Sequence, residues 1–411
     1  MRVLFAWEMG RNFGHVTQIV PVAEALLRRG ASIHMALRNP AAIAPFAGAS
    51  RFQVFQAPFR SPGKLPPGTA KIRSLIFADE LQRCGYDQAK TLATLLGNWQ
   101  QVFRRVQPDV LIAQASPTAM LASLGMPIRR FSLGGGFDVP PATAPLQGMR
   151  YWEKGHNLEM AARESRMLAT INKALDMHGR EPLKSFRDFL VTDKNFLCTV
   201  QELDHYPDRG AASYYGALSK TDSGTPLTWA TDARYRILAY IRPEVPVFAP
   251  TIAALAQLPA DHDVIVSAPG LPTASQRQLE RPGLRVVDGP VRLDGLLPGC
   301  DVCINHATRG TCSAALLAGV PVLMLPSHIE QLMQARAIAR NGMGLGMSGN
   351  FGPAEVVQTL TRMLADSRYR EAARALQDKY RGLNPDHIAD QLADEITAMA
   401  TSASPRTNTS G

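Results

Sequence analysis

Short apolar runs and amphipathic segments alternate along the first half of the chain. MRVLFAW is almost wholly apolar, a polar loop follows it, and HVTQIVPVAEALLRRG then carries its apolar residues at helical spacing. Gly30 ends this segment, as glycine often does after a helix, and ASIHMAL forms the next apolar run. Strands that alternate with helices in this way predict a parallel sheet with helices on both faces.

The same alternation returns in the second half of the chain. It starts at RYRILAYIRP and continues through HDVIVS, LRVV and DVCINH, with helical spacing after them. Between the two halves, residues 134–189 read as a long loop and a helical insertion, and residues 206–230 are rich in Gly, Ser, Thr and Asp. We therefore expect two α/β domains of similar size.

The length of 411 residues agrees with this division, because a single core rarely grows so large. The expected parts are an N-terminal domain at 1–215, a linker at 216–230, a C-terminal domain at 231–385, a C-terminal helix at 386–400 and a disordered tail at 401–411.

The composition is that of a globular protein, with 45% apolar and 19% charged residues. No run reaches the roughly 18 apolar residues that cross a membrane. The apolar start has no small-residue cleavage site, so we expect a cytoplasmic protein. The five cysteines are scattered, which favours reduced thiols over disulfides, and Cys303 of the CxxC falls inside a strand, which favours core packing over a metal site.

The net charge of +9 comes from dispersed Arg and Lys residues, with no basic run interleaved with aromatic residues. We therefore expect no nucleic-acid partner. A positive surface also suits anionic ligands or an anionic membrane face, so peripheral contact with a membrane stays open, as does the oligomeric state.

The most informative stretch of the chain is NHATRGTCSAALLAGVPVLMLPSHIEQ, which ends at Gln331. Because it follows the expected strand DVCIN, its first residues fall at the carboxyl end of a parallel strand, where such domains bind ligands. A helix that opens at Arg309, Gly310 and Thr311 would aim backbone N–H groups and a positive dipole at this end. Phosphate fits there, and ordinary helix capping is the alternative.

This stretch closely resembles the donor-binding signature of GT-B glycosyltransferases, the superfamily of UDP-glycosyltransferases and of bacterial antibiotic and rhamnolipid glycosyltransferases. The matching positions are His306, Gly310–Thr311, Gly319–Val320–Pro321, Pro326 and Glu330–Gln331. Gly14–His15–Val16 is similar to the N-terminal motif of the family. The resemblance implies two Rossmann-like parallel-sheet domains that face each other across a cleft, with C-terminal helices packing back.

The resemblance also implies that these positions bind a nucleotide-diphosphate sugar, which is a co-substrate, so that no cofactor is expected. The helix start would hold the pyrophosphate, the Glu–Gln pair would bind the sugar hydroxyls, and backbone groups of Val291 would read the pyrimidine. The residues expected at the donor are Arg242, Ser267, Val291, His306, Thr308, Arg309, Gly310, Thr311, Glu330 and Gln331.

His15 would be the general base that takes the proton of the acceptor hydroxyl, since the ordinary pKa of histidine suits that work at neutral pH. The resemblance implies an inverting displacement without a metal, in which helix-dipole and histidine contacts stabilise the leaving diphosphate. The Asp-x-Asp at Asp261 and Asp263 precedes a strand, so we expect it in a solvated turn away from the site.

Two departures from the family pattern concern the ribose and the base. The Glu that grips both ribose hydroxyls in UDP-sugar enzymes is Ala314 here, which favours a dTDP-sugar over a UDP-sugar, with rhamnose suggested by analogy. The Asp that orients the histidine is replaced by Gln114 or Ser116, with Asp138 as a further substitute. We assign Gln114 to the catalytic site beside His15.

A third departure lies at the phosphate. The paired glycines that follow the motif histidine are Ala307 and Thr308, whose Cβ atoms would crowd the approach of a phosphate. Arg309 beside them would compensate with a charged donor.

The partners implied by the resemblance are a nucleotide-sugar and a small-molecule or lipid acceptor that bears a hydroxyl. The N-terminal residues that could line the acceptor pocket are Trp7, Phe13, Phe137, Trp152, Leu158 and Met160. The departures also fit a catalytically impaired GT-B scaffold that acts as a binding or auxiliary protein. A sugar-nucleotide epimerase on the same fold is a third reading.

Overall fold

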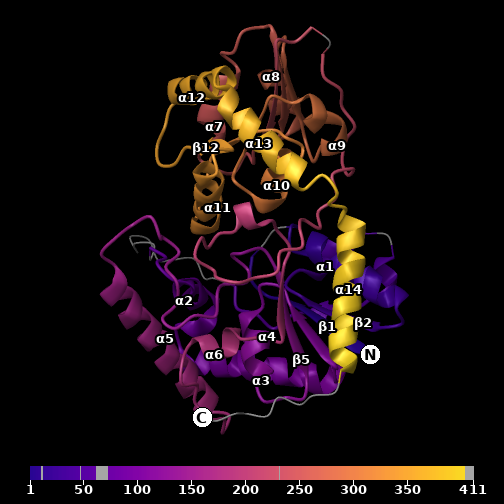
Figure 1. The fold of residues 1–411 in the computed structure, drawn as a ribbon, viewed down its shortest axis with the longest axis vertical. Helices are drawn as coiled ribbons and strands as arrows, with labels where there is room; N and C mark the ends of the chain where they lie inside the picture. The colour runs from indigo at the N-terminus through magenta and orange to yellow at the C-terminus, as the bar shows by residue number, and fades with distance from the viewer. Residues whose placement is uncertain (11–12, 47, 62–72, 231, 403–411) are drawn as a thin grey trace. The chain divides into compact units, whose positions relative to one another are not determined.

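The computed structural model describes residues 1–10, 13–46, 48–61, 73–230 and 232–402, and it divides the chain into two α/β units (Figure 1). The N-terminal unit comprises Met1–Val200, Tyr206–Leu218 and the chain from Asn384 onward. The C-terminal unit comprises Gln201–His205 and Ser219–Leu383. Each unit is built on one parallel sheet of six strands, as the alternation of strands and helices predicts.

The sheet of the N-terminal unit has the strand order β3-β2-β1-β4-β5-β6, and every neighbouring pair is parallel. Its strands are β1 (Arg2–Trp7), β2 (Ser32–Leu37), β3 (Gln53–Gln56), β4 (Val110–Ala113), β5 (Arg129–Gly134) and β6 (Lys194–Leu197). The central strands β1 and β4 are buried almost throughout, which explains why their sequences are runs of apolar residues without polar alternation.

The helices of this unit cover the two faces of its sheet. They are α1 (Val16–Arg28), α2 (Phe77–Leu81), α3 (Ala89–Val106), α4 (Pro117–Ala122), α5 (Asn157–Asp176), α6 (Arg187–Leu190) and α14 (Pro385–Thr401). The apolar face of α3 buries Trp99 and Phe103 in the core, beside Tyr86.

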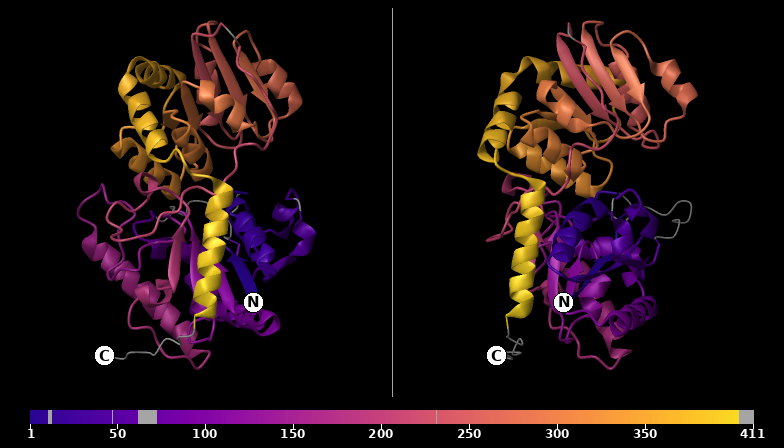
Figure 2. Two further views of the ribbon diagram at one scale, coloured as in Figure 1. Left: turned by 45° about the vertical axis from the view of Figure 1, so that its right-hand side comes forward. Right: turned by 90° about the vertical axis from the view of Figure 1, so that its right-hand side faces the viewer.

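The last helix, α14, packs back on the N-terminal unit beside α1, as both views of Figure 2 show. The Arg29 guanidinium lies 2.9 Å from the Asp390 carboxylate and 2.7 Å from that of Asp394. The helix therefore belongs to the N-terminal unit, although it follows the C-terminal unit in the sequence. The segment 403–411, which includes most of the expected tail, lies outside the described residues.

The sheet of the C-terminal unit has the strand order β12-β11-β10-β7-β8-β9, and its neighbours are also parallel. Its strands are β7 (Tyr235–Tyr240), β8 (His262–Ser267), β9 (Leu284–Val287), β10 (Val302–Asn305), β11 (Val322–Met324) and β12 (Gly344–Gly346). Its helices are α7 (Phe248–Leu255), α8 (Thr273–Leu279), α9 (Leu293–Leu296), α10 (Arg309–Leu317), α11 (Ile329–Arg340), α12 (Pro353–Ala365) and α13 (Ser367–Lys379).

The segment expected as a linker differs from that expectation, because residues 219–230 are part of the C-terminal unit. Backbone hydrogen bonds fix them there. Thr221 accepts from the N–H of Leu293 at 2.8 Å, and Thr225 pairs with Val291 as an isolated parallel bridge. The Trp229 indole also donates to the Leu296 carbonyl at 2.8 Å.

All five cysteines are free thiols, and Cys198, Cys300, Cys303 and Cys312 are buried. The two cysteines of the CxxC therefore pack in the core of the C-terminal unit. Within the described residues, no helix combines the length and apolar character needed to cross a membrane.

Candidate functional site

His15 lies at the start of α1, in the loop that follows β1. Its imidazole stacks on the buried indole of Trp7, with 5.0 Å between the ring centroids. Its Nδ1 lies 2.8 Å from Oε1 of Gln114, the residue that follows β4. Because an amide oxygen only accepts, Nδ1 carries the proton and Nε2 keeps a lone pair. The ring therefore has the tautomer that a base acting through Nε2 needs.

The backbone of Gly10 lies against the Nε2 edge of this ring. Gly10 has φ +82°, and a Cβ built there would lie 2.1 Å from His15 Nε2. Any residue with a side chain would thus displace the imidazole. Glycine at this position serves two needs, a left-handed backbone and a close approach to the ring.

The other two residues considered as partners of His15 have different contacts. The Ser116 hydroxyl donates to Oε1 of Glu8 at 3.1 Å. The Asp138 carboxylate accepts from the backbone N–H of Gly135 at 3.1 Å. Gln114 is the residue that the structure places against Nδ1 of the histidine.

Glu8 is a buried carboxylate that the sequence analysis missed. It follows β1 directly and is 4% exposed. Its carboxylate accepts from Ser116, from the backbone N–H groups of Thr118 and Ala119, and from the Trp99 indole at 3.3 Å. Burial nevertheless raises the pKa of Glu8 to about 7. The sequence did contain a signal for Glu8, since an acidic residue directly after a buried parallel strand falls at the end of the sheet where ligands bind.

The motif residues of the C-terminal unit follow β10, whose neighbours are β7 and β11. His306 is buried, and both of its ring nitrogens meet backbone groups. Nε2 accepts from the N–H of Arg242 at 3.0 Å, and Nδ1 lies 3.4 Å from the carbonyl of Leu325. Burial lowers the pKa of His306, so the ring is neutral at neutral pH.

His306 therefore joins the loops after β7 and β11, and in this conformation it holds no N–H free for a phosphate. This differs from the donor role that the resemblance implies. The reason is that the ring is buried between the two loops and contacts a backbone group through each nitrogen.

The residue after His306 takes an unusual backbone conformation. Ala307 has φ +58°, the left-handed region that L-residues with a Cβ seldom adopt. Its N–H donates to Oδ1 of Asn305 at 2.7 Å, and the Cys312 thiol donates to the same oxygen at 3.2 Å. Asn305 thus holds the turn at the position where the resemblance implies glycine. The Ala307 side chain is buried, so its methyl group does not crowd the solvent-facing approach.

The first turn of α10 follows this turn. The Thr308 hydroxyl donates to Oγ1 of Thr311 at 3.1 Å and does not cap the helix. Arg309, Gly310 and Thr311 are half-buried in this first turn. The backbone N–H groups at the helix start are thus not satisfied by the side chain at its N-cap, and they attract an anion.

The loops after β8 and β9 carry the residues expected at the base. The Ser267 hydroxyl donates to the carbonyl of Gly289 at 2.7 Å, so it holds the loop after β9 (288–291) in place, a role different from the expected phosphate contact. In the bridge to this loop, the N–H of Thr225 donates to the Pro290 carbonyl and the Thr225 carbonyl accepts from the N–H of Arg292. Because successive peptides of an extended chain point to opposite sides, the N–H and C=O of Val291 face away from Thr225.

The remaining donor candidates lie at the ends of β7 and β11. The Arg242 guanidinium is 41% exposed and lies 3.5 Å from the Glu244 carboxylate. Glu330 is half-buried in the first turn of α11. Oε1 of Gln331 accepts from the backbone N–H and the hydroxyl of Ser327, at 2.8 and 2.9 Å.

The Asp-x-Asp lies at the start of β8, at the opposite end of the sheet, as expected. Asp263 is buried rather than solvated, with its oxygens bonded to Arg285 and to the N–H of Ala230. Across the part of the chain that the structure describes, no cluster of three or more His, Cys, Asp or Glu side chains could hold a metal.

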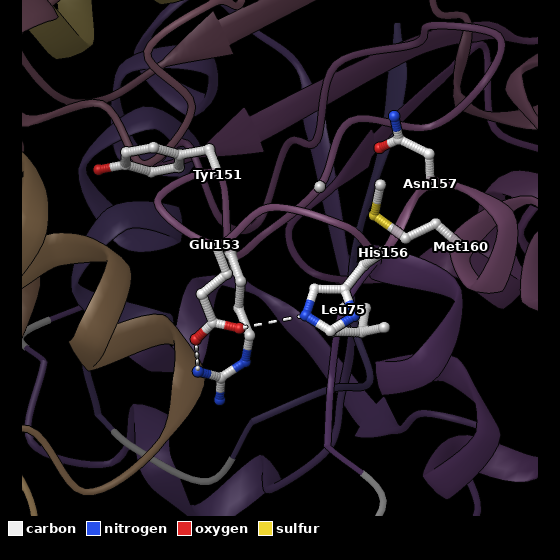
Figure 3. Close-up of a pocket in the computed structure, with 8 residues that line it drawn as sticks. Leu75, Tyr151, Glu153, His156, Asn157 and Met160 are labelled. Carbon is white, nitrogen blue, oxygen red and sulfur yellow. Dashed lines mark hydrogen bonds and ion pairs between the residues drawn. The ribbon is translucent and has the colours of Figure 1, made fainter.

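The N-terminal unit also contains a cavity of about 210 Å³ (Figure 3). It is lined by Leu75, Gly148, Arg150, Tyr151, Glu153, His156, Asn157 and Met160. The Glu153 carboxylate lies 3.2 Å from the Arg150 guanidinium and 3.7 Å from Nε2 of His156. The cavity combines apolar side chains with a fixed charged edge, which suits a ligand of the same mixed character.

Of the six residues expected in an acceptor pocket, Met160 lines this cavity and Trp152 packs against its wall residue Tyr151, with 5.0 Å between the ring centroids. Trp7 is instead buried under His15. Leu158 is 89% exposed and Phe13 is 53% exposed. Of these residues, Met160 is therefore the one that lines this cavity directly.

The fold is that of the GT-B glycosyltransferases. The calicheamicin glycosyltransferase CalG4 superposes with a TM-score of 0.70, at 17% identity, over 98% of this chain and 99% of that chain. The glycosyltransferase VinC, solved in complex with dTDP, superposes with a TM-score of 0.63, at 18% identity, over 97% of this chain and 99% of that chain.

The C-terminal part of the chain adds a likeness in sequence. Residues 250–394 match the family described as erythromycin biosynthesis protein CIII-like, C-terminal domain. The elloramycin glycosyltransferase ElmGT of Streptomyces olivaceus is 36% identical over 149 residues, which cover 35% of this chain and 37% of that protein. The resemblance to bacterial antibiotic glycosyltransferases that the motifs indicate is thus confirmed, while the match spans little more than a third of this relative's length.

Replacing Asn305 should destabilise the C-terminal unit. Asn305→Ala leaves the buried N–H of Ala307 without its acceptor, which costs about 2 kcal/mol. Asn305→Ser should lose less, because a serine hydroxyl can form the same local bond more weakly. Chemical denaturation followed by circular dichroism measures both. The control is Asn350→Ala, which removes an exposed amide of the same unit. Equal losses at positions 305 and 350 would refute the role of Asn305.

The buried Glu8 should make stability depend on pH. The pKa of Glu8 is about 7 in the folded chain and about 4.5 without burial, so the folded state holds more protons between these values. Stability should therefore fall as pH rises through this window, by about 3 kcal/mol, and level off above it. We expect Glu8→Gln to lack this component.

The measurement is urea denaturation of both proteins at pH 5 and pH 8, followed by tryptophan fluorescence. Trp7, Trp99 and Trp152 report on the N-terminal unit, and Trp229 is the fourth tryptophan of the chain. The same change of stability with pH in both proteins would contradict the raised pKa of Glu8.

Proposed function

We propose that this chain is an inverting glycosyltransferase that moves a sugar from a nucleotide-diphosphate donor to a hydroxyl of a small-molecule or lipid acceptor. A dTDP-sugar is favoured over a UDP-sugar as the donor, and no metal is required. The observation that carries the proposal is that the expected donor residues all lie at the carboxyl ends of β7, β8, β9, β10 and β11, which are neighbouring strands of one sheet.

The start of α10 is the proposed diphosphate site. Its N–H groups and dipole favour negative charge, and Arg309 in its first turn adds a cation. This charge would stabilise the leaving diphosphate in the way that a metal does in other transferases. The Asp-x-Asp supports the same reading, because its buried Asp263 is engaged by Arg285 and is at the opposite end of the sheet.

The preference for dTDP rests on Ala314, one turn into α10 from Thr311. A Glu at this position would accept hydrogen bonds from both ribose hydroxyls, and alanine offers no such acceptor. A 2′-deoxyribose has no 2′-hydroxyl to satisfy and therefore loses less at this site. The structure of VinC in complex with dTDP shows that a protein of this fold binds this nucleotide.

His15 is the proposed base. The acceptor oxygen attacks the anomeric carbon as its proton passes to Nε2, and the bond from that carbon to the diphosphate oxygen breaks with its electron pair. Gln114 fixes the tautomer but is neutral, so it stabilises the imidazolium less than a carboxylate would.

The acceptor is proposed to use the cavity beside Tyr151 and Met160. Its apolar wall suits a carbon skeleton, and its edge at Glu153 and His156 suits hydroxyl groups (Figure 3). A hydroxylated small molecule satisfies both.

His15→Ala should abolish transfer from a dTDP-sugar, by a factor of at least about 100, because the general base is lost. The affinity for dTDP should stay within about twofold, since the donor residues lie in the other unit. Transfer assays with calorimetric titration measure the two effects, and His34→Ala on β2 is the matched control. Transfer at the wild-type rate by His15→Ala would remove the assignment of the base.

The second candidate function is a GT-B scaffold that binds a nucleotide without turnover. The neutral Gln114 beside His15 and the engaged ring of His306 favour it. Tight dTDP binding by the wild-type protein with no transfer from any dTDP-sugar or UDP-sugar would support this candidate.

A further inference from the structure

We propose that Glu8 is a positioning residue for His15, the proposed base. Glu8 holds the turn after β4 so that Gln114 stays in contact with His15. The inference rests on the proposed function, in which His15 takes the acceptor proton. Glu8 acts through the turn and through Gln114.

The carboxylate of Glu8 accepts hydrogen bonds from several residues of one turn. Its Oε1 accepts from the Ser116 hydroxyl at 3.1 Å, from the N–H of Ala119 at 3.4 Å, and from the N–H of Thr118. All three donors belong to the turn that opens α4, a helix whose own N-cap residue makes no side-chain cap. Glu8, the residue directly after β1, therefore supplies the cap and fixes the turn to the end of that strand.

Backbone hydrogen bonds from Glu8 and Met9 hold the same turn at Ala115, the residue with a strained backbone. Ala115 has φ +46°, a conformation unfavourable for a residue with a Cβ. Its carbonyl accepts from the N–H of Met9 at 3.0 Å and from that of Glu8 at 3.4 Å. Gln114 immediately precedes this residue, so the direction of its side chain depends on the same contacts.

The residues that flank Glu8 hold the other side of the histidine. Trp7 stacks on the ring of His15, and the Trp7 indole donates to the carbonyl of Met9 at 2.5 Å. Gly10 has no side chain to displace the ring at its Nε2 edge. Four consecutive residues thus place the ring and its partner, and Glu8 is the one that links the two loops through its side chain.

The ionised carboxylate, which is the main form of Glu8 above about pH 7, suits this arrangement because the donors converge on it. Trp99 donates to Oε2, while Ser116 and two backbone N–H groups donate to Oε1. A carboxylate accepts on both oxygens, whereas an amide would turn an N–H group toward one set of donors. Around Glu8, Arg38 donates to its backbone carbonyl, and the thiol of Cys84 and the phenol of Tyr86 also lie near it.

The test compares Glu8→Gln, Gln114→Ala and the double variant. Glu8→Gln should lower kcat by about 10- to 100-fold with the KM for the donor within about twofold, since only the base is displaced. In the Gln114→Ala background the same change should cost less than about twofold, because both act through one contact. Equal losses in the two backgrounds would overturn the proposal.

A second readout does not depend on transfer. Nitrogen NMR of the His15 ring should show the Nδ1–H tautomer in the wild-type protein and a mixture of tautomers in Glu8→Gln. Ser116→Ala removes one of the hydrogen bonds to Glu8, and it should move the ring signals in the same direction by a smaller amount. Unchanged His15 signals in both variants would contradict the role of Glu8.

The control for a general loss of stability is Asp263→Asn, which alters a buried carboxylate of the C-terminal unit. We expect it to keep kcat even where its Tm falls as far as that of Glu8→Gln. An equal loss of kcat would reduce Glu8 to a structural residue. If the wild-type protein shows the expected tautomer but transfers no sugar, the proposed function fails while the positioning by Glu8 stands.

Discussion

The parallel pairing of the central strands is the constraint on which the rest of the structure depends. In each unit the central strands run in one direction, so the loops at their carboxyl ends meet at one edge. β1 and β4 place His15 against Gln114, although the two residues are 99 positions apart. In the C-terminal unit, β10 and β7 place His306 against the backbone of Arg242 in the same way.

Both edges contain a turn that costs energy and is held by a side chain. Ala115 and Ala307 have left-handed backbones, and each lies two residues beyond the end of a central strand. Glu8 holds the first turn and Asn305 the second. Strained residues of this kind persist where surrounding contacts fix them, and they gather at functional sites. The two turns are thus the places where the stability of the fold serves the proposed chemistry.

The sequence predicted the features that local patterns encode. The alternation of apolar runs and helical segments predicted both parallel sheets, and the motif that ends at Gln331 indicated the sheet edge at which the proposed donor residues lie. It did not reveal contacts between distant segments. The carboxylate of Glu8 is satisfied by donors from Thr118 and Trp99, which are far from it in the sequence. Residues 219–230 are attached to their unit by contacts with Val291 and its neighbours. His306 matched its motif, yet its ring is engaged by backbone groups that no motif specifies.

The central claim is that the edge formed by α10 and the base loop binds a thymidine diphosphate. Calorimetric titration of the wild-type protein with dTDP, UDP and GDP tests it most directly. We expect dTDP to bind more tightly than UDP, because Ala314 offers nothing to a 2′-hydroxyl. We expect GDP to bind weakly, because the loop at Val291 is proposed to read a pyrimidine. Failure of the folded protein to bind any of the three nucleotides would contradict the account.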